Sequence, residues 1–343
     1  MESNQPIYVI CPNRNFAVGG IKQLYKLVDV LNDIGYSAYI IHGKKNFRVT
    51  WFENQTPIKY FPSFFALLRK ERRKNKSKFP LFLKQLFLGY KMPEKNSIIV
   101  FPEVYGPNIH KLAPENKIVI FNQNCYFTFN LFDRVQKDSP YESSNLLGCI
   151  VVSDDSQKYL QHAFPNLNVA RINLALSDVF QYSGSKKKQI AFMPRKLPED
   201  FNQVHQIVSK RPDFKDWEFV AIENMPELEV AQILKESAIF LSFNHREGFG
   251  LPPVEAMACG CYVIGYTGNG GNEYFDDRFN SIISDRDITQ FAVELEHIVK
   301  TYNNDPNVII QKGYLASKFA LETYNKTNER KDLSIAWKSL LSN

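Results

Sequence analysis

The stretch Asn244-His-Arg-Glu-Gly-Phe-Gly-Leu-Pro-Pro-Val-Glu-Ala-Met-Ala-Cys-Gly260 follows a short apolar run of strand type and ends in a helix-forming segment. Gly248 and Gly250 let the backbone turn sharply and approach a ligand closely. Pro252 suits the first turn of a helix, where its missing N–H group costs nothing. The stretch therefore predicts a strand, a glycine loop and a helix in succession, with a ligand at the loop.

Backbone amides and two carboxylates surround the predicted loop. Free N–H groups of Phe249, Gly250 and Leu251 would point out of the helix N-terminus, which is a ready site for a phosphate or diphosphate. Glu247 in the loop and Glu255 in the second helical turn do not belong beside a phosphate on charge grounds. They are better interpreted as acceptors for sugar hydroxyls, although each also fits a plain structural role, Glu255 as a helix N-terminal acid favoured by the macrodipole.

The same segment resembles the Glu-x7-Glu signature of retaining glycosyltransferases with the GT-B fold, in particular family 4 of the glycosyltransferase group 1 superfamily. The following Ala-x-Ala-Cys-Gly run belongs to that resemblance. It implies that Glu255 holds the ribose of a nucleotide and that Glu247 contacts the donor sugar during catalysis. It further implies that the amides of Phe249, Gly250 and Leu251 hold the diphosphate, and that the reaction retains the sugar configuration without a metal.

Composition describes a soluble protein of two domains. At 343 residues the chain exceeds the usual single core, and 44% of its residues are apolar and 23% charged. No run approaches the ~20 apolar residues of a membrane helix, and Met1 to Pro6 is too short and polar for a signal peptide. These features predict a cytoplasmic protein. The five cysteines show no zinc spacing and fit reduced thiols.

The net charge of +6 is unevenly spread, because a strongly basic run, 69–78, lies between aromatic-rich flanks in residues 60–90. Basic residues beside exposed aromatic side chains favour an anionic membrane surface or a lipid-phosphate acceptor, which would place the protein at the inner face of the membrane. A solvated loop between two helices with buried apolar faces explains the same pattern. No nucleic-acid-binding motif accompanies the charge, so nucleic acid is not expected as a partner.

The chain opens with a predicted β-α-β unit. A buried strand at 6–11 precedes a helix with apolar residues at helical spacing, 21–31, and a second strand at 37–42. Such a unit implies a parallel sheet of Rossmann type, although its turn lacks the Gly-x-Gly-x-x-Gly dinucleotide fingerprint. Gly19 and Gly20 in that turn resemble the glycine pair that admits donor phosphate or acceptor in the glycosyltransferase family. A purely structural turn is the alternative.

Two further buried strands, 96–101 and 117–121, each end in a polar loop. Ligands of open α/β sheets collect at the carboxyl ends of strands, so Glu103, Asn122 and Asn124 are expected on the acceptor side of a cleft. Members of the family often carry a histidine in this neighbourhood, and none stands here. The acceptor-side contact can therefore not be carried over from the family.

The second half of the chain opens with a predicted strand at 189–193, which Pro194, Arg195 and Lys196 follow directly. Two cations at the carboxyl end of a strand can neutralise a diphosphate leaving group, arginine through a forked contact and lysine as a point charge. The family places an arginine and a lysine in this loop for that purpose, farther apart than here. Arg195 and Lys196 are therefore, with Glu247, the predicted catalytic residues.

The remaining features complete the GT-B resemblance. Gly270 and Gly271 resemble the family's Gly-Gly-x-x-Glu loop, with a different spacing, and their amides are expected to close over the donor. The final stretch, 313–341, has helical periodicity, and in the GT-B fold the last helix returns to the N-terminal domain. The expected architecture is α/β, with two Rossmann-like domains facing across a cleft. The predicted parts are an acceptor domain at 1–176, a donor domain at 177–322 and a returning helix at 323–343.

The predicted function is the transfer of a sugar from a UDP-, GDP- or TDP-sugar to a hydroxyl of a glycan or a lipid-linked glycan, with no metal and no cofactor besides the nucleotide sugar. Transfer builds positive charge at the anomeric carbon and negative charge on the departing diphosphate, which the cations and amides would stabilise. Two alternatives keep the same fold. One is a nucleotide-sugar epimerase, and the other is a non-catalytic module that binds a nucleotide sugar or a lipid phosphate.

Overall fold

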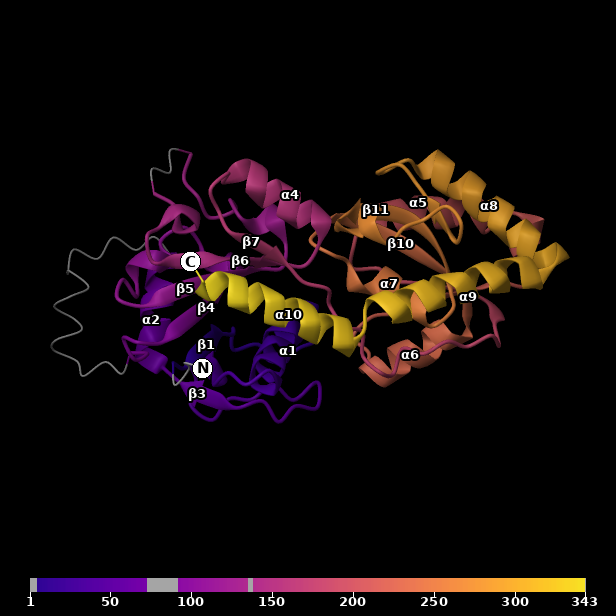
Figure 1. Ribbon diagram of the computed structural model, residues 1–343. Helices are drawn as coiled ribbons and strands as arrows, with labels where there is room; N and C mark the ends of the chain where they lie inside the picture. The colour runs from indigo at the N-terminus through magenta and orange to yellow at the C-terminus, as the bar shows by residue number, and fades with distance from the viewer. Residues whose placement is uncertain (1–4, 73–91, 135–137, 343) are drawn as a thin grey trace. The chain divides into compact units, whose positions relative to one another are not determined.

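The computed structural model describes residues 5–72, 92–134 and 138–342, and Figure 1 shows its ribbon. The chain divides into two compact units. Unit 1 consists of Met1–Val152, Ser156–Ile172 and Arg330–Asn343. Unit 2 consists of Ser153–Asp155 and Asn173–Glu329. Each unit contains one parallel sheet with helices packed on it, which confirms the predicted pair of Rossmann-like α/β units.

The sheet of unit 1 has seven parallel strands in the order β3-β2-β1-β4-β5-β6-β7. The strands are β1 (Ile7–Ile10), β2 (Ala38–His42), β3 (Ile58–Tyr60), β4 (Ile98–Pro102), β5 (Lys117–Asn122), β6 (Leu146–Val151) and β7 (Val169–Arg171). Strands β1 and β4 are buried along their whole length, which is typical of a parallel sheet that carries helices on both faces. The connecting helices include α1 (Gly19–Asp33), α2 (Pro62–Arg72) and α4 (Asp154–Ala163).

Helix α1 begins earlier than its apolar spacing predicts. Gly19 and Gly20 are its first two residues, and Val18 is its cap, so the pair forms the first helical turn and not the loop before it. The helix buries Leu24, Leu27 and other apolar residues at helical spacing against the sheet.

The sheet of unit 2 has five parallel strands in the order β12-β11-β10-β8-β9. The strands are β8 (Lys187–Phe192), β9 (Glu218–Ala221), β10 (Ser237–Glu247), β11 (Tyr262–Asn269) and β12 (Asn280–Ile282). The helices are α5 (Pro198–Val208), α6 (Glu227–Glu236), α7 (Leu251–Ala258), α8 (Ile288–Asn304) and α9 (Pro306–Thr323). Helices α5 and α8 pack on each other and share a core with the strands, in which Val204 and Phe291 lie with Ile239. Helix α7 packs against α9 and α6.

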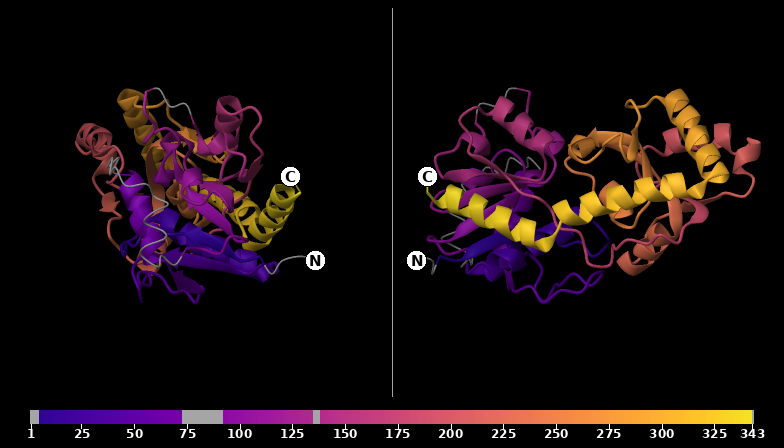
Figure 2. Two further views of the ribbon diagram at one scale, coloured as in Figure 1. Left: turned by 90° about the vertical axis from the view of Figure 1, so that its left-hand side faces the viewer. Right: turned by 45° about the vertical axis from the view of Figure 1, so that its right-hand side comes forward.

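The end of the chain belongs to unit 1, as the GT-B resemblance implies. The predicted helical stretch consists of two helices, α9 and α10 (Lys326–Leu341), and residues from Arg330 onward lie in unit 1. Trp337 is fully buried there and packs edge-on against Tyr36, while Arg330 donates a hydrogen bond to the carbonyl of Asp33 at 2.8 Å. Figure 2 shows the yellow α10 from two further sides.

The basic and aromatic region at residues 60–90 is described only in part. Helix α2 buries Phe64, Phe65 and Leu68 in the core of unit 1, whereas residues 73–91, which carry most of the basic run, lie outside the described residues. The predicted anionic membrane surface stays a prediction. In the described parts of the chain, no helix combines the length and apolar character needed to cross a membrane.

Candidate active site

The glycine loop of the quoted stretch lies at the carboxyl edge of the unit 2 sheet. Strand β10 is longer than predicted, because residues 244–247 still pair with β11 across a bulge, and Glu247 is its last residue. Gly250, with φ of 83°, is the left-handed cap of α7. A side chain at Gly250 would place Cβ 2.5 Å from Asn244 Nδ2 and 2.9 Å from the Tyr274 hydroxyl. Glycine is therefore required here on both steric and conformational grounds.

Tyr274 holds this loop from inside unit 2. Its hydroxyl is shared between the carbonyls of Phe249, at 2.9 Å, and Gly250, at 2.8 Å, and its ring packs edge-on against Phe249. Burial raises the pKa of Tyr274 well above the usual tyrosine value, so the hydroxyl stays protonated as a donor. Pro252 and Pro253 in the first turn of α7 carry no N–H group, so the amide of Leu251 is the donor that this turn offers next to the cap residue Gly250, and helix geometry gives it no intrahelical acceptor.

Two predicted catalytic residues are in direct contact. Lys196, in the loop after β8, forms an ion pair with Glu247 at the end of β10, and their side chains are 37% and 19% exposed. Arg195 is exposed, and among the described residues no ion pair holds its side chain. Glu255 is half-buried in the second turn of α7, as predicted. The loop after β8 and the end of the adjacent parallel strand β10 thus bring a cation to a carboxylate.

The second glycine turn packs against the first. Gly270 and Gly271 are buried at the start of a 3₁₀ helix, Gly270–Glu273, that follows β11. A Cβ atom at Gly270 would lie 2.5 Å from the carbonyl of Gly248 and 2.6 Å from that of Glu247, and one at Gly271 would lie 2.9 Å from the hydroxyl of Tyr274. The two predicted donor loops therefore form one contiguous group in unit 2, with their backbones in direct contact.

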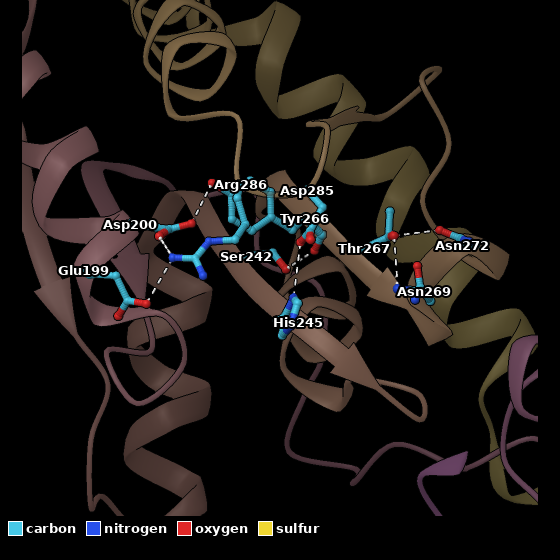
Figure 3. A network of polar contacts seen from close by, with 10 residues as sticks. All are labelled: Glu199, Asp200, Ser242, His245, Tyr266, Thr267, Asn269, Asn272, Asp285 and Arg286. Atoms are coloured by element: carbon cyan, nitrogen blue, oxygen red, sulfur yellow. Dashed lines mark hydrogen bonds and ion pairs between the residues drawn. The ribbon is translucent and has the colours of Figure 1, made fainter. Parts of the chain in front are cut away.

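Sequence reasoning missed a polar network at the start of α5, the helix that follows the loop with Arg195 and Lys196, here called the cation loop. Figure 3 draws this network. Asp200, 2% exposed in the first turn of α5, accepts from Arg286 at 2.8 Å and from the hydroxyl of Tyr266 at 3.1 Å. Arg286 also reaches Glu199 at 3.1 Å and adopts a left-handed φ of 62°. Nothing in the sequence pairs these residues, which are up to 87 positions apart. The position of Tyr274, an aromatic residue directly after the predicted glycine turn, was a weak indication in the sequence that it contacts the turn.

In unit 1, three groups converge at the carboxyl edge of the sheet. A Cβ atom at Gly20 would lie 3.2 Å from Oε1 of Gln123, and the amide of Gln123 donates to Oε2 of Glu103 at 3.2 Å. Glu103 is half-buried as a residue, but its carboxyl group is enclosed, and burial raises its pKa to about 7 although the amide of Gln123 opposes the shift. Gly19, one residue earlier, is exposed.

The two predicted asparagines use their side chains inside unit 1. Asn122 is fully buried and donates to Thr128 at 2.9 Å and to the hydroxyl of Tyr141 at 3.0 Å. Asn124 is 7% exposed and accepts from the amide of Tyr126 at 3.0 Å. These contacts hold the turn after β5. Within the described residues, no group of three or more His, Cys, Asp or Glu side chains is arranged to hold a metal.

Comparison with known sequences identifies relatives of the chain. The sequence pattern of the family described as glycosyl transferases group 1 matches residues 219–315, which include both glycine turns. The chain is 30% identical over 228 residues to an alpha-1,6-glucosyltransferase of Actinobacillus pleuropneumoniae serotype 7 (strain AP76). That match covers 63% of this chain and 68% of the relative.

Solved structures share the two-unit GT-B fold. Sucrose-phosphate synthase from Thermosynechococcus elongatus matches with a TM-score of 0.69 at 12% identity, over 99% of this chain and all 100% of that one. The pneumococcal O-GlcNAc transferase GtfA, in complex with UDP and GlcNAc, matches with a TM-score of 0.63 at 11% identity, over 99% of each chain. Anabaena HepE, in complex with UDP and glucose, matches with a TM-score of 0.62 at 12% identity, over 98% and 100% of the two chains. At such identities the likeness concerns the fold alone, whereas the sequence relative shows the family. The chain belongs to the glycosyl transferases group 1 and is a glycosyltransferase.

Proposed function

We propose that this glycosyltransferase moves a hexose from a nucleoside diphosphate sugar to a hydroxyl of a glycan or a lipid-linked glycan, with retention of configuration and without a metal or other cofactor. The observation that carries the proposal is the contact between Lys196 and Glu247 beside the start of α7. Together with the N-terminal amides of α7, this contact supports a donor site at the carboxyl edge of the unit 2 sheet, which is where parallel α/β sheets bind ligands.

Each group suits one part of the donor. The amides of Gly250 and Leu251 and the cations Arg195 and Lys196 would stabilise the negative charge that develops on the departing diphosphate. Glu247 would accept a hydrogen bond from a hydroxyl of the transferred sugar, and Glu255 would bind the ribose. The departing phosphate would then take the proton of the acceptor hydroxyl on the same face of the sugar, which retains the configuration.

The donor to test first is UDP-glucose. GtfA and HepE were solved with UDP, and the Actinobacillus relative is named a glucosyltransferase. GDP- and TDP-sugars form the comparison panel. Release of the nucleoside diphosphate with and without a glycan extract measures transfer and hydrolysis separately.

The assignment of residues is tested by Glu247→Ala, Glu255→Ala and Arg195→Ala. Each variant is expected to lose roughly hundredfold in transfer rate, the size typical of one lost group that stabilises developing charge or places the donor. Glu218→Ala, which removes an exposed carboxylate of β9, is the matched control and should retain full activity. Near-normal turnover of all three site variants would refute the assignment.

Retention of configuration and independence from a metal are each tested by a separate measurement. NMR of the product should show the anomeric configuration of the donor, and a chelator should leave the rate unchanged. Conversion of the donor sugar to its epimer in the absence of an acceptor would instead indicate the epimerase alternative.

A further inference from the structure

Two loops of unit 1 form a surface that no role described above explains. They are residues 12–18, which follow β1, and residues 43–54, which follow β2, and together they are called the two-loop surface. Strands β1 and β2 are neighbours and parallel, so both loops leave the same edge of the sheet. That is the edge at which open α/β sheets bind ligands.

Side-chain hydrogen bonds fasten the two loops together. Oδ1 of Asn13 accepts from the amide of Gly43 at 3.3 Å and lies 3.1 Å from Nδ1 of the buried His42. Oδ1 of Asn15 accepts from the amide of Thr50 at 2.8 Å, and Nδ2 of Asn15 donates to Oγ1 of Thr50 at 2.9 Å. The first loop is thus attached near both ends of the turn at 43–50, and the two loops keep a fixed register.

The turn itself is held from within. Asn46 is left-handed with φ of 58°, and the amide of Phe47 bonds the carbonyl of Lys44 at 3.2 Å. The ring of Phe47 packs edge-on against His42 at 4.8 Å, and the hydroxyl of Tyr60 donates to the carbonyl of Phe47 at 3.2 Å. The anchoring groups therefore point inward, which leaves other side chains of the turn to face solvent.

Four of the outward side chains are cationic. Arg14, Lys44, Lys45 and Arg48 are exposed, while Glu53 is the single acid in the two loops. Among the described residues no ion pair with a carboxylate holds any of the four cations. Arg48 donates to Oδ1 of Asn54 at 2.6 Å, and its charge also favours the ionised form of Asp29, so the uncompensated charge is that of Arg14, Lys44 and Lys45. An anchored surface with uncompensated positive charge attracts an anionic ligand.

One exposed aromatic ring lies among these cations. Phe16 is 56% exposed, and the guanidinium of Arg14 lies 5.8 Å from the centre of its ring. Of the large apolar side chains in the two loops, Phe16 alone is exposed. Binding to a bilayer interface grows with the apolar area that it buries, and one ring supplies little of it. One ring does offer a flat apolar face of the size of one sugar.

We propose that the two-loop surface binds the acceptor, and that this acceptor is a saccharide carrying a phosphate or carboxylate group, with Phe16 against its ring and Arg14, Lys44 and Lys45 around its charge. This assignment rests on the proposed transfer to a separate acceptor and names the chemical class of that acceptor. The charged group can belong to a soluble sugar or to the sugar end of a lipid-linked glycan.

The test measures binding of three soluble probes by NMR titration: glucose, glucose 6-phosphate and glucuronic acid. The wild-type protein is expected to bind the two anionic sugars roughly tenfold more tightly than glucose at low salt, and the preference should disappear at about 0.5 M salt because the charges are exposed. The double variant Lys44→Gln/Lys45→Gln should lose most of the preference. Lys210→Gln/Lys215→Gln removes the same charge from exposed positions of unit 2 and should keep it. Phe16→Ala should weaken the binding of all three sugars to a similar degree.

Several results would overturn the proposal. Equal affinity for glucose and the anionic sugars would do so, as would the same loss in the control double variant. Inorganic phosphate that binds as tightly as glucose 6-phosphate, unaffected by Phe16→Ala, would indicate a bare anion site. Binding to phosphatidylglycerol vesicles but to none of the sugars, abolished by Lys44→Gln/Lys45→Gln, would indicate a membrane surface.

Hydrolysis of UDP-glucose without an acceptor separates this inference from the proposed function. All of the two-loop variants should hydrolyse the donor at the wild-type rate. Intact hydrolysis without any charge preference refutes the acceptor class and leaves the proposed transfer standing. A clear charge preference without consumption of any nucleotide sugar refutes the proposed transfer, and with it the acceptor role of a surface that still binds anionic sugars.

Discussion

Gly250 is the residue at which the conformation of the candidate site is decided. Its left-handed φ of 83° and the crowding by Asn244 and Tyr274 exclude a side chain on two independent grounds. We predict that Gly250→Ala lowers the free energy of unfolding by about 2–4 kcal/mol, from left-handed strain plus overpacking, and weakens UDP binding. Urea unfolding and a UDP titration measure the two effects.

Gly35→Ala provides the matched control. Gly35 is also left-handed, with φ of 96°, but a Cβ atom there would meet nothing within 4 Å. The Gly35→Ala substitution should lower the free energy of unfolding by only about 1–2 kcal/mol. Equal losses in the two variants would mean that the contacts around Gly250 relax freely and do not shape the loop.

His42 makes the stability of unit 1 depend on pH. Burial lowers the pKa of His42 from 6.5 to about 4. Between pH 4 and pH 6.5, His42 therefore binds a proton in the unfolded chain but not in the folded chain. The contribution of His42 to stability therefore falls as the pH drops from 6.5 to 4, by about 3 kcal/mol in total. Replacement of His42 by Gln should remove this contribution from the pH profile of urea unfolding between pH 4 and 7, while His162→Gln, at an exposed position, should leave the wild-type profile unchanged.

Glu103 acts in the opposite direction in the same unit. Burial raises its pKa from 4.5 to about 7, so the folded chain keeps a proton that the unfolded chain releases, and its contribution is lost as the pH rises through this window. The two slopes oppose each other between pH 4.5 and 6.5. In the Glu103→Gln variant the free energy of unfolding should therefore fall with decreasing pH, because only His42 contributes. In the His42→Gln variant it should fall with increasing pH, because only Glu103 contributes. Parallel pH profiles of the two variants would contradict both assignments.

At the scale of elements, helix α5 links the cation loop to the interior of unit 2. The loop with Arg195 and Lys196 ends at Leu197, which is left-handed, and Asp200 in the next turn is held by Arg286 and Tyr266 (Figure 3). Asp200 is thus placed to fix the position of the helix that closes the loop.

We predict that Asp200→Ala destabilises unit 2 by about 2–3 kcal/mol, because it leaves the Tyr266 hydroxyl without its acceptor in a buried position, and that it weakens UDP binding through the displaced cation loop. Asp276→Ala is the control, since the Asp276 side chain is 32% exposed beside Arg278 and should contribute less than about 1 kcal/mol. An unchanged UDP affinity in a destabilised Asp200→Ala protein would show that α5 does not position the cations.

Much of this element order could be predicted from the sequence, because buried strands and glycine turns are local patterns. Strand β1 follows its apolar run closely, and the strand, glycine loop and helix around Gly250 occur as expected. Strand β10 extends beyond the predicted apolar run to Glu247, because its last residues pair with β11 through backbone groups, and composition does not reveal such pairing. The contact between Lys196 and Glu247 joined two candidates that the family resemblance had selected separately. The bond between Asp200 and Arg286 spans 86 positions and left no local pattern.

At the scale of the whole molecule, the last turns of α10 complete unit 1. Trp337 is fully buried against Tyr36, whereas Ile335 on the same helix is 60% exposed. We predict that Trp337→Ala lowers the stability of unit 1 by about 3–5 kcal/mol, and that Ile335→Ala changes it by less than about 1 kcal/mol. Calorimetry should show one transition moved to lower temperature in the first variant. A uniform shift of all transitions would mean that the two units unfold as one body.

The placement of residues 330–342 also bears on how a ribosome delivers this protein. Residues up to 172 leave the ribosome well before Trp337 is synthesised, so the core of unit 1 lacks this side chain until the end of synthesis. Residues 173–329 of unit 2 emerge as one continuous stretch and can fold as soon as they have emerged. Domains made first usually finish first during synthesis. In this chain the half that is made first is completed last.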